Sequence, residues 1–152
     1  MIIVALSDTH GNVNAIKKIM PVLKNADLTV HLGDHFYDVD FLKGTLKTDP
    51  VTVYGNCDGG GDDLVLNLEN TVVLLTHGDK YGVKSSLTRL YLRAKELGAK
   101  LVLYGHTHQP KIENFDGITF VNGGCMTAFC ETPTYAKIEI NDGIIDAKII
   151  KA

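Results

Sequence analysis

Seven candidate metal-binding residues lie between positions 8 and 108 of the 152-residue chain. Asp8 and His10 are two positions apart, as are His106 and His108, so in an extended loop each pair can direct two donor atoms toward one side. Carboxylate, imidazole and amide groups together suit manganese, iron, zinc, nickel or cobalt, and this mixture indicates a catalytic site. The candidate ligands are Asp8, His10, Asp34, Asn56, His77, His106 and His108.

The number of candidate ligands favours two ions over one. A single ion uses about three or four protein ligands. Seven side chains are therefore better explained by two ions, about 3.5 to 4 Å apart, that share one carboxylate. Asp34 is the aspartate predicted to bridge them.

Short β-branched apolar runs precede these candidate ligands, and each run is typical of a buried strand. Ligand sites in open α/β sheets lie beyond the carboxyl ends of the strands. We therefore expect the loops that carry the candidate ligands to converge on one edge of the molecule. The five predicted strands are Ile2–Leu6, Leu28–Leu32, Val51–Tyr54, Val72–Leu75 and Leu101–Tyr104.

Two helices and a series of hairpins complete the predicted elements. Apolar residues recur at helical spacing over Asn14–Lys24 and over Lys84–Leu97, where Gly98 is the expected stop. The last third carries the strand-like segments KIENF, ITFVN, YAKIEI and IIDAKII, and the pairs Asp116-Gly117 and Asp142-Gly143 favour tight hairpins. This order predicts a single α/β domain over residues 1–152, with two packed sheets flanked by helices and the strand order left open.

Composition limits the partners that the chain is expected to bind. The formal net charge is -3 and the charged residues are interspersed, so the basic stripe that long nucleic acid requires is absent. No run approaches the ~20 apolar residues of a membrane span. Met1 leads directly into a strand-like segment rather than a charged leader. We expect a cytoplasmic protein with no membrane contact, and the sequence leaves open a homo-oligomer.

Three cysteines are present, at positions 57, 125 and 130. Their number is odd and they lack the CxxC spacing of a zinc or redox motif. Neither a disulfide framework nor a thiolate zinc site is therefore indicated, and we expect reduced thiols.

Five short blocks carry a resemblance to a known family. DTHGN, GD, GNCD, HGD and GHTH, in this order from Asp8 to His108, resemble the motif set of the calcineurin-like metallophosphoesterases. The short length and the GNCD form are similar to the small bacterial and archaeal phosphodiesterases of that superfamily, and to the retromer subunit that shares their fold. The resemblance implies a four-layer α/β/β/α fold, a β-sandwich with helices on both outer faces.

The resemblance also implies roles for the candidate ligands. One ion is expected on Asp8, His10 and His108, the other on Asn56, His77 and His106, with Asp34 between them. Asp34, Asn56 and His106 are the residues expected to act in catalysis. The implied reaction is hydrolysis of a small phosphodiester by a hydroxide that two divalent metals activate. Manganese is the first choice of metal, with nickel, cobalt, zinc, iron or magnesium as others.

Three positions depart from the family pattern. Cys57 stands where many members carry the histidine that is the usual candidate for protonating the leaving group. Asp79 replaces the last histidine of an HGH block, which adds negative charge and disfavours monoesters. Asn122-Gly123-Gly124-Cys125 stands where relatives commonly show an NPGS-like segment.

Simpler interpretations remain beside these. His31, inside a predicted strand, is expected to be a hydrogen-bonded core residue, and His35 a loop residue with no metal role. Cys57 is either a small buried hydrophobe or part of the cleft wall. A non-catalytic scaffold or binding module is the alternative to an enzyme, although a scaffold does not need seven intact ligands. A nuclease is chemically close but fits the charge poorly.

Overall fold

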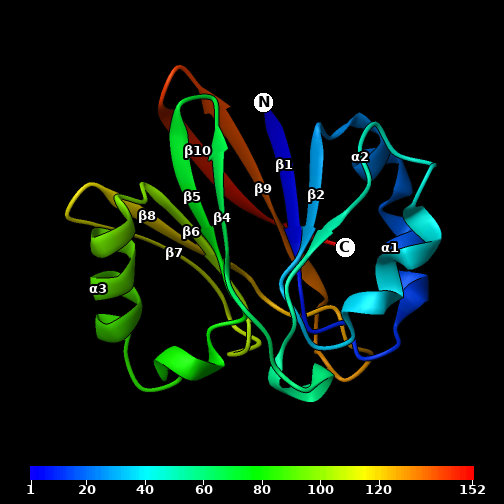
Figure 1. Ribbon diagram of the computed structural model, residues 1–152. Coiled ribbons are helices and arrows are strands. Elements are labelled where there is room, and N and C mark those ends of the chain that lie inside the picture. The colour runs from blue at the N-terminus through cyan, green and yellow to red at the C-terminus, as the bar shows by residue number, and fades with distance from the viewer.

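The computed structural model describes residues 1–152 and contains two five-stranded sheets packed face to face (Figure 1). The first sheet has the strand order β10-β9-β1-β2-β3. In it, β1 runs parallel to β2 and β2 parallel to β3, whereas β9 and β10 are antiparallel. Its strands are β1 (Ile2–Leu6), β2 (Leu28–His31), β3 (Val51–Thr52), β9 (Thr134–Asn141) and β10 (Ile144–Lys151).

The second sheet has the order β4-β5-β6-β8-β7. Here β5, β6 and β8 are parallel, and the edge strands β4 and β7 are antiparallel to their neighbours. Its strands are β4 (Leu64–Leu68), β5 (Thr71–Leu75), β6 (Leu101–Tyr104), β7 (Pro110–Phe115) and β8 (Ile118–Gly123).

Three apolar clusters hold four layers together, as the resemblance implied. The largest lies between the two sheets and includes Ile3, Leu103 and Ile138. A second cluster joins α1 (Val13–Lys18) and α2 (Met20–Asn25) to the outer face of the first sheet, and a third joins α3 (Thr88–Leu97) to the second. Figure 1 shows the helices on opposite outer sides. No helix is long and apolar enough to cross a membrane.

The observed helices are shorter than the predicted ones. The helix expected over Asn14–Lys24 divides at Ile19, because Pro21 lacks the backbone N–H that would continue the hydrogen-bond ladder and instead opens α2. Similarly, the helix expected from Lys84 begins only at Thr88. Short 3-10 helices occupy three of the loops: η1 (Phe36–Leu42), η2 (Asn56–Asp58) and η3 (Asp79–Tyr81).

The hairpins follow their turn residues. Asp116-Gly117 and Asp142-Gly143 all have positive φ, as the predicted tight turns require. Strand β4 was not predicted, because its turn to β5 uses Glu69 and Asn70, which lack the glycine signal although both have positive φ. This strand forms one edge of the second sheet.

The parallel strands place the candidate ligands. The loops after β1, β2, β3, β5 and β6 carry them, and these loops gather at the lower end of the molecule in Figure 1. Both sheets therefore contribute to one end of the sandwich, as expected from the carboxyl ends of parallel strands.

Candidate metal centre

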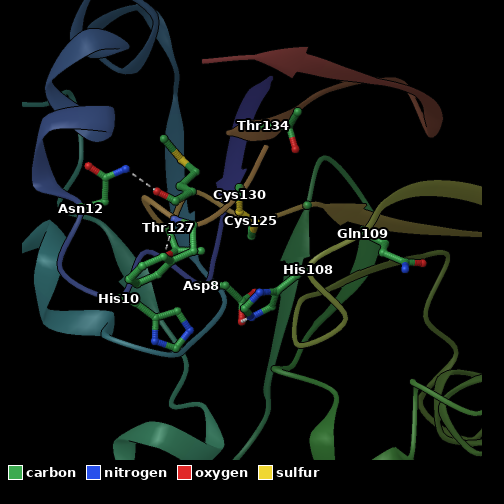
Figure 2. Close-up of a disulfide and its surroundings, with 12 residues drawn as sticks. Asp8, His10, Asn12, His108, Gln109, Cys125, Thr127, Cys130 and Thr134 are labelled. Atoms are coloured by element: carbon green, nitrogen blue, oxygen red, sulfur yellow. Dashed lines mark hydrogen bonds and ion pairs between the residues drawn. A yellow bond between two sulfur atoms is a disulfide. The ribbon is translucent and has the colours of Figure 1, made fainter. Parts of the chain in front are cut away.

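Four of the predicted ligands form a compact group. One ligand atom from each of Asp8, His10, Asp34 and His108 can be chosen so that all four lie within 4.8 Å of one another. His108 Nε2 lies 3.1 Å from Asp8 Oδ1, and His10 Nε2 lies 3.6 Å from Asp34 Oδ2. Figure 2 shows Asp8, His10 and His108 together. We call these four residues the first ligand group.

One buried oxygen in this group fits a metal ion. Asp8 is fully buried, and its Oδ2 accepts hydrogen bonds from Ser7 Oγ at 2.5 Å and from the His106 backbone N–H at 3.2 Å. Its Oδ1 has no hydrogen-bond partner, and the nearest ionisable group is the His108 ring, whose Nε2 lies 3.1 Å away. A buried carboxylate oxygen without a partner is costly, and a cation would compensate it.

We call Asn56, His77 and His106 the second ligand group, and it meets the first at Asp34. Asp34 Oδ2 faces His10, while its Oδ1 lies 3.5 Å from His77 Nε2. Asn56 Oδ1 lies 3.0 Å from the same nitrogen, and the rings of His77 and His106 are 5.0 Å apart. The two oxygens of one carboxylate thus face histidines of different groups, which is the arrangement that a bridging ligand needs.

Hydrogen bonding orients His77 and keeps Asp34 ionised. His77 Nδ1 lies 2.6 Å from the Leu32 carbonyl oxygen, to which it can only donate, so Nε2 is the nitrogen free to bind metal. Burial lowers the pKa of His77, but Asp34 and the other acceptors outweigh it and raise that pKa. Burial works against the charge on Asp34, yet His77 and the Cys57 backbone N–H hold the pKa of that carboxyl well below its usual range.

Five of the predicted ligands have left-handed backbone conformations and not the extended ones expected from their spacing. Their φ angles lie between 43° and 69°. Non-glycine residues adopt this region uncommonly, and such residues concentrate at functional sites. The five residues are Asp8, His10, Asp34, His106 and His108.

Two glycines of the motifs allow neighbouring side chains to lie against the backbone, and neither has an unusual backbone angle. Gly55 has φ of -91°, which any residue tolerates, but a Cβ there would collide with the Asp34 carboxylate. At Gly105 a Cβ would lie 2.7 Å from Ser7 Oγ and 2.9 Å from Asp8 Oδ2. Both glycines therefore leave space for the two aspartates.

Known proteins resemble this chain in sequence and in fold. A profile of the calcineurin-like phosphoesterase superfamily domain matches residues 1–143. The chain belongs to the calcineurin-like phosphoesterase superfamily. It is 34% identical over 130 residues to the probable metallophosphoesterase YsnB of Bacillus subtilis, covering 83% of this chain and 75% of YsnB. It is 26% identical to the phosphodiesterase MJ0936 of Methanocaldococcus jannaschii, covering 85% and 87%.

Solved structures share the fold. A predicted phosphoesterase from Streptococcus pneumoniae superposes with a TM-score of 0.83 and 26% identity, over 99% of this chain and 88% of that one. Vacuolar protein sorting 29 from Cryptosporidium parvum superposes with a TM-score of 0.78 and 16% identity, over 99% and 97%. The second likeness concerns the fold alone.

Two aspartates that were not among the predicted site residues, Asp58 and Asp38, support the site in this member of the superfamily. Asp58 accepts hydrogen bonds from the backbone N–H groups of Asp34 and Gly55 at 2.8 and 2.9 Å, which ties the loops after β2 and β3 together. Asp38 accepts from Gly11 N and Thr9 Oγ1, both at 2.7 Å. Asp58 is the last residue of the GNCD block, so the motif could have identified it, whereas Asp38 lies outside all five blocks.

His31 is a hydrogen-bonded core residue, as the simpler interpretation predicted. His31 is buried, lies 2.9 Å from Thr9 Oγ1 and accepts from Gly33 N on Nδ1. Burial lowers its pKa to about 4, so it is a neutral core histidine. His35 packs its ring 5.2 Å from that of His10 and lies outside the first ligand group.

Two of the departures from the family pattern, Cys57 and Asp79, lie near the candidate ligands. Cys57 is exposed, and its backbone N–H donates to Asp34 Oδ1 at 2.9 Å. Partial desolvation by neighbouring atoms and the nearby Asp34 carboxylate raise the pKa of its thiol. The buried-hydrophobe interpretation of Cys57 is therefore wrong. Asp79 is half-buried, and its charge acts to raise the pKa of His106 against the lowering effects of burial and His77.

The expectation of three reduced thiols is wrong. Cys125 and Cys130 form a disulfide in the loop between β8 and β9, and only Cys57 is free. Their Cα atoms lie 6.4 Å apart because the loop turns back on itself within five residues. An odd cysteine count showed only that one thiol is left over. Figure 2 shows this disulfide beside Asp8 and His108.

Proposed function

We propose that the chain is a metal-dependent phosphodiesterase with two divalent ions. Asp8, His10 and His108 would hold one ion, Asn56, His77 and His106 the other, and Asp34 both. The observation that carries this proposal is Asp34, whose two carboxylate oxygens face His10 and His77 at 3.6 and 3.5 Å. The unpartnered Asp8 Oδ1 supports the first of the two ions.

The bound metals would lower the pKa of water and neutralise charge on the phosphoryl oxygens. The residues of the chain supply position and charge around them. Asp34 stays ionised through His77 and the Cys57 backbone N–H. Asp8 is held by Ser7 and the His106 backbone, so that its free oxygen keeps one direction. Rigid ligands of this kind reduce the reorganisation needed during reaction.

Charge favours a diester over a monoester. A monoester carries one more negative charge at neutral pH, and Asp79 acts on His106 of the second ligand group. Like charges repel, so the more anionic substrate is disfavoured at this edge. The phosphodiesterase name of the Methanocaldococcus relative supports the same choice.

The test uses metal-stripped protein with manganese, nickel, cobalt, zinc and magnesium added back separately. Hydrolysis of bis-p-nitrophenyl phosphate is compared with that of p-nitrophenyl phosphate, and bound metal is counted by mass spectrometry. We expect turnover of the diester, weaker turnover of the monoester, and two ions per chain in the most active sample. Faster monoester turnover, or a single ion at full activity, would contradict the proposal.

A non-catalytic binding module is the second candidate. The observation in its favour is Cys57, an exposed thiol at the position of the expected acid, in a fold shared with vacuolar protein sorting 29. Under this alternative the chain binds metal normally but hydrolyses neither ester with any of the five metals.

A further inference from the structure

We propose that the loop closed by the Cys125–Cys130 disulfide binds the uncharged, ring-bearing arm that stays on the phosphoryl group when the leaving group departs, with Phe129 as the surface on which the ring stacks. This inference rests on the proposed phosphodiesterase function and adds a class of substrate to it. An aryl group or a nucleoside is an arm of this kind.

A cavity joins this loop to the first ligand group. Its volume is about 780 Å³, and His10 and His108 line it together with both cysteines of the disulfide and Phe129. A phosphoryl group held at the two histidines would therefore direct one of its ester arms along the loop. Figure 2 shows Cys125, Cys130 and Thr127 next to His10 and His108.

Phe129 is unusually exposed for an aromatic residue. Its exposed fraction is 96%, the highest among the large hydrophobic residues of the chain. A phenylalanine at the wall of a cavity, with almost its whole ring in water, offers a face to a second ring. Stacking on aromatic side chains tolerates any base or aryl ring, since each has a π-face.

The loop is braced, so little ordering is needed when a ligand binds. Besides the disulfide, Cys130 N donates to the Thr127 carbonyl at 3.2 Å, and Asn12 Nδ2 donates to the Met126 carbonyl at 2.8 Å. The Met126 N–H in turn donates to the Asp8 carbonyl. Preorganisation of this kind favours binding by lowering its entropic cost.

The remaining lining suits a neutral arm with hydroxyl groups. Glu131 and Lys151 carry opposite charges, and Thr127 and Thr132 add hydroxyls. A strongly anionic arm would find no excess positive charge in this cavity. The single charge of a diester belongs to the phosphoryl group, which the ligand groups accommodate.

A second cavity of about 1030 Å³ lies on the other side of the loop after β6. Thr107 and Gln109 line that cavity, whereas His108 and Pro110 line the first. Alternate residues of one loop therefore face different cavities. Only the first cavity includes predicted metal ligands, so the ring-bearing arm is assigned to it. Phe115 lines the second cavity and is 61% exposed, which makes it a matched control.

The test compares two diesters with the same leaving group and the same charge. These are methyl p-nitrophenyl phosphate and the p-nitrophenyl ester of thymidine 5′-phosphate. The wild type should prefer the nucleoside diester in kcat/KM. Phe129→Ala should reduce that preference about tenfold, in line with the usual contribution of stacking. Phe115→Ala should leave the preference unchanged, and all three proteins should bind the same amount of metal.

A second measurement does not depend on activity. Thymidine added to the metal-free protein should shift the NMR signals of residues 127–134 in the wild type and not in Phe129→Ala. An unchanged preference in Phe129→Ala, an equal effect of Phe115→Ala, or no shift with thymidine would overturn the inference. If thymidine shifts the loop but no ester is hydrolysed, the proposed function fails and the ring-binding site stands.

Discussion

At the scale of single residues, hydrogen bonds to one side-chain atom of a ligand leave its other atom available for a metal ion. Asp8 has one oxygen engaged by Ser7 and His106 and one without a partner. His77 has one nitrogen engaged by Leu32 and one directed to Asp34 and Asn56. Because the engaged atoms fix each side chain, the free atoms have defined directions, which is the property a metal site requires.

Asp34→Ala should remove both ions, whereas His108→Ala should remove one, because only Asp34 faces both ligand groups. Loss of a residue that merely orients a metal ligand typically costs ~10- to 100-fold, so loss of Asp34 itself should lower kcat/KM at least ~100-fold. Metal counting and diester hydrolysis check this. Asp146→Ala, on the exposed β9–β10 hairpin, is the control. Two retained ions in Asp34→Ala would contradict the bridging role.

Cys57→His should help substrates with poor leaving groups. An alkoxide needs a proton as it departs, whereas p-nitrophenolate does not, and general acid help is typically ~10²- to 10⁴-fold. Cys57 is exposed beside Asp34, so an imidazole can be accommodated there. We expect kcat/KM to rise for cyclic nucleotides much more than for bis-p-nitrophenyl phosphate, with metal content unchanged. Equal changes for both substrates would assign residue 57 to site geometry instead.

At the scale of elements, the loops after the strands contact one another in pairs. Asp58, after β3, accepts from the backbone of Asp34, after β2, and Ser7, after β1, lies against Gly105, after β6. The spacing between loops is therefore set by contacts that a single added methyl group would disturb.

Gly55→Ala tests this spacing. Its backbone accepts alanine, but the new Cβ would collide with the Asp34 carboxylate, and such overpacking costs about 1–3 kcal/mol. We expect lower stability and weaker metal binding together. Gly59→Ala is the matched control, since Gly59 has φ of +88° with nothing within 4 Å of its Cβ position. That variant should lose stability through the backbone and keep its metal affinity, and calorimetry with metal titration distinguishes the two.

Opening the Cys125–Cys130 disulfide should destabilise the protein modestly. A ring this short limits the unfolded chain little, so the expected loss is about 2 kcal/mol. Urea unfolding with and without a reductant measures it. The double variant Cys125→Ser/Cys130→Ser should match the reduced wild type and no longer respond to the reductant. A wild type whose stability is the same with and without the reductant would contradict the pairing.

At the scale of the whole molecule, the site joins the two sheets. Asp8, Asp34 and Asn56 follow strands of the first sheet, while His77 and His108 follow strands of the second. Neither sheet contains a complete ligand group by itself, since Asp8 pairs with His108 and Asp34 with His77. Metal binding is therefore expected to stabilise the packing of one sheet against the other.

Metal should raise the melting temperature. A ligand that binds only the folded state at a hundred times its Kd adds about 2.7 kcal/mol of stability. Manganese titrated against metal-free protein in thermal unfolding should show this rise in the wild type, and Asp34→Ala should show little of it. An equal rise in Asp34→Ala would mean that the ion binds elsewhere.

The sequence by itself determined the family, the alternation of strands and helices, and the residues that became candidate ligands. These features are local, because strand runs, turn pairs such as Asp142-Gly143 and the five motif blocks each lie within a few residues. The first strand and the β6 strand were predicted to the residue, since apolar runs bounded by polar turns leave little freedom.

Only the tertiary structure decided the rest. The strand order, the left-handed ligands, the pairing of Cys125 with Cys130 and the support from Asp38 depend on contacts between segments far apart or on loop paths. The helix predicted over Asn14–Lys24 is two helices separated at Ile19, with Pro21 in the first turn of the second. Side-chain type is a property of one position, whereas the direction of a free oxygen or nitrogen is set by every group that packs around it.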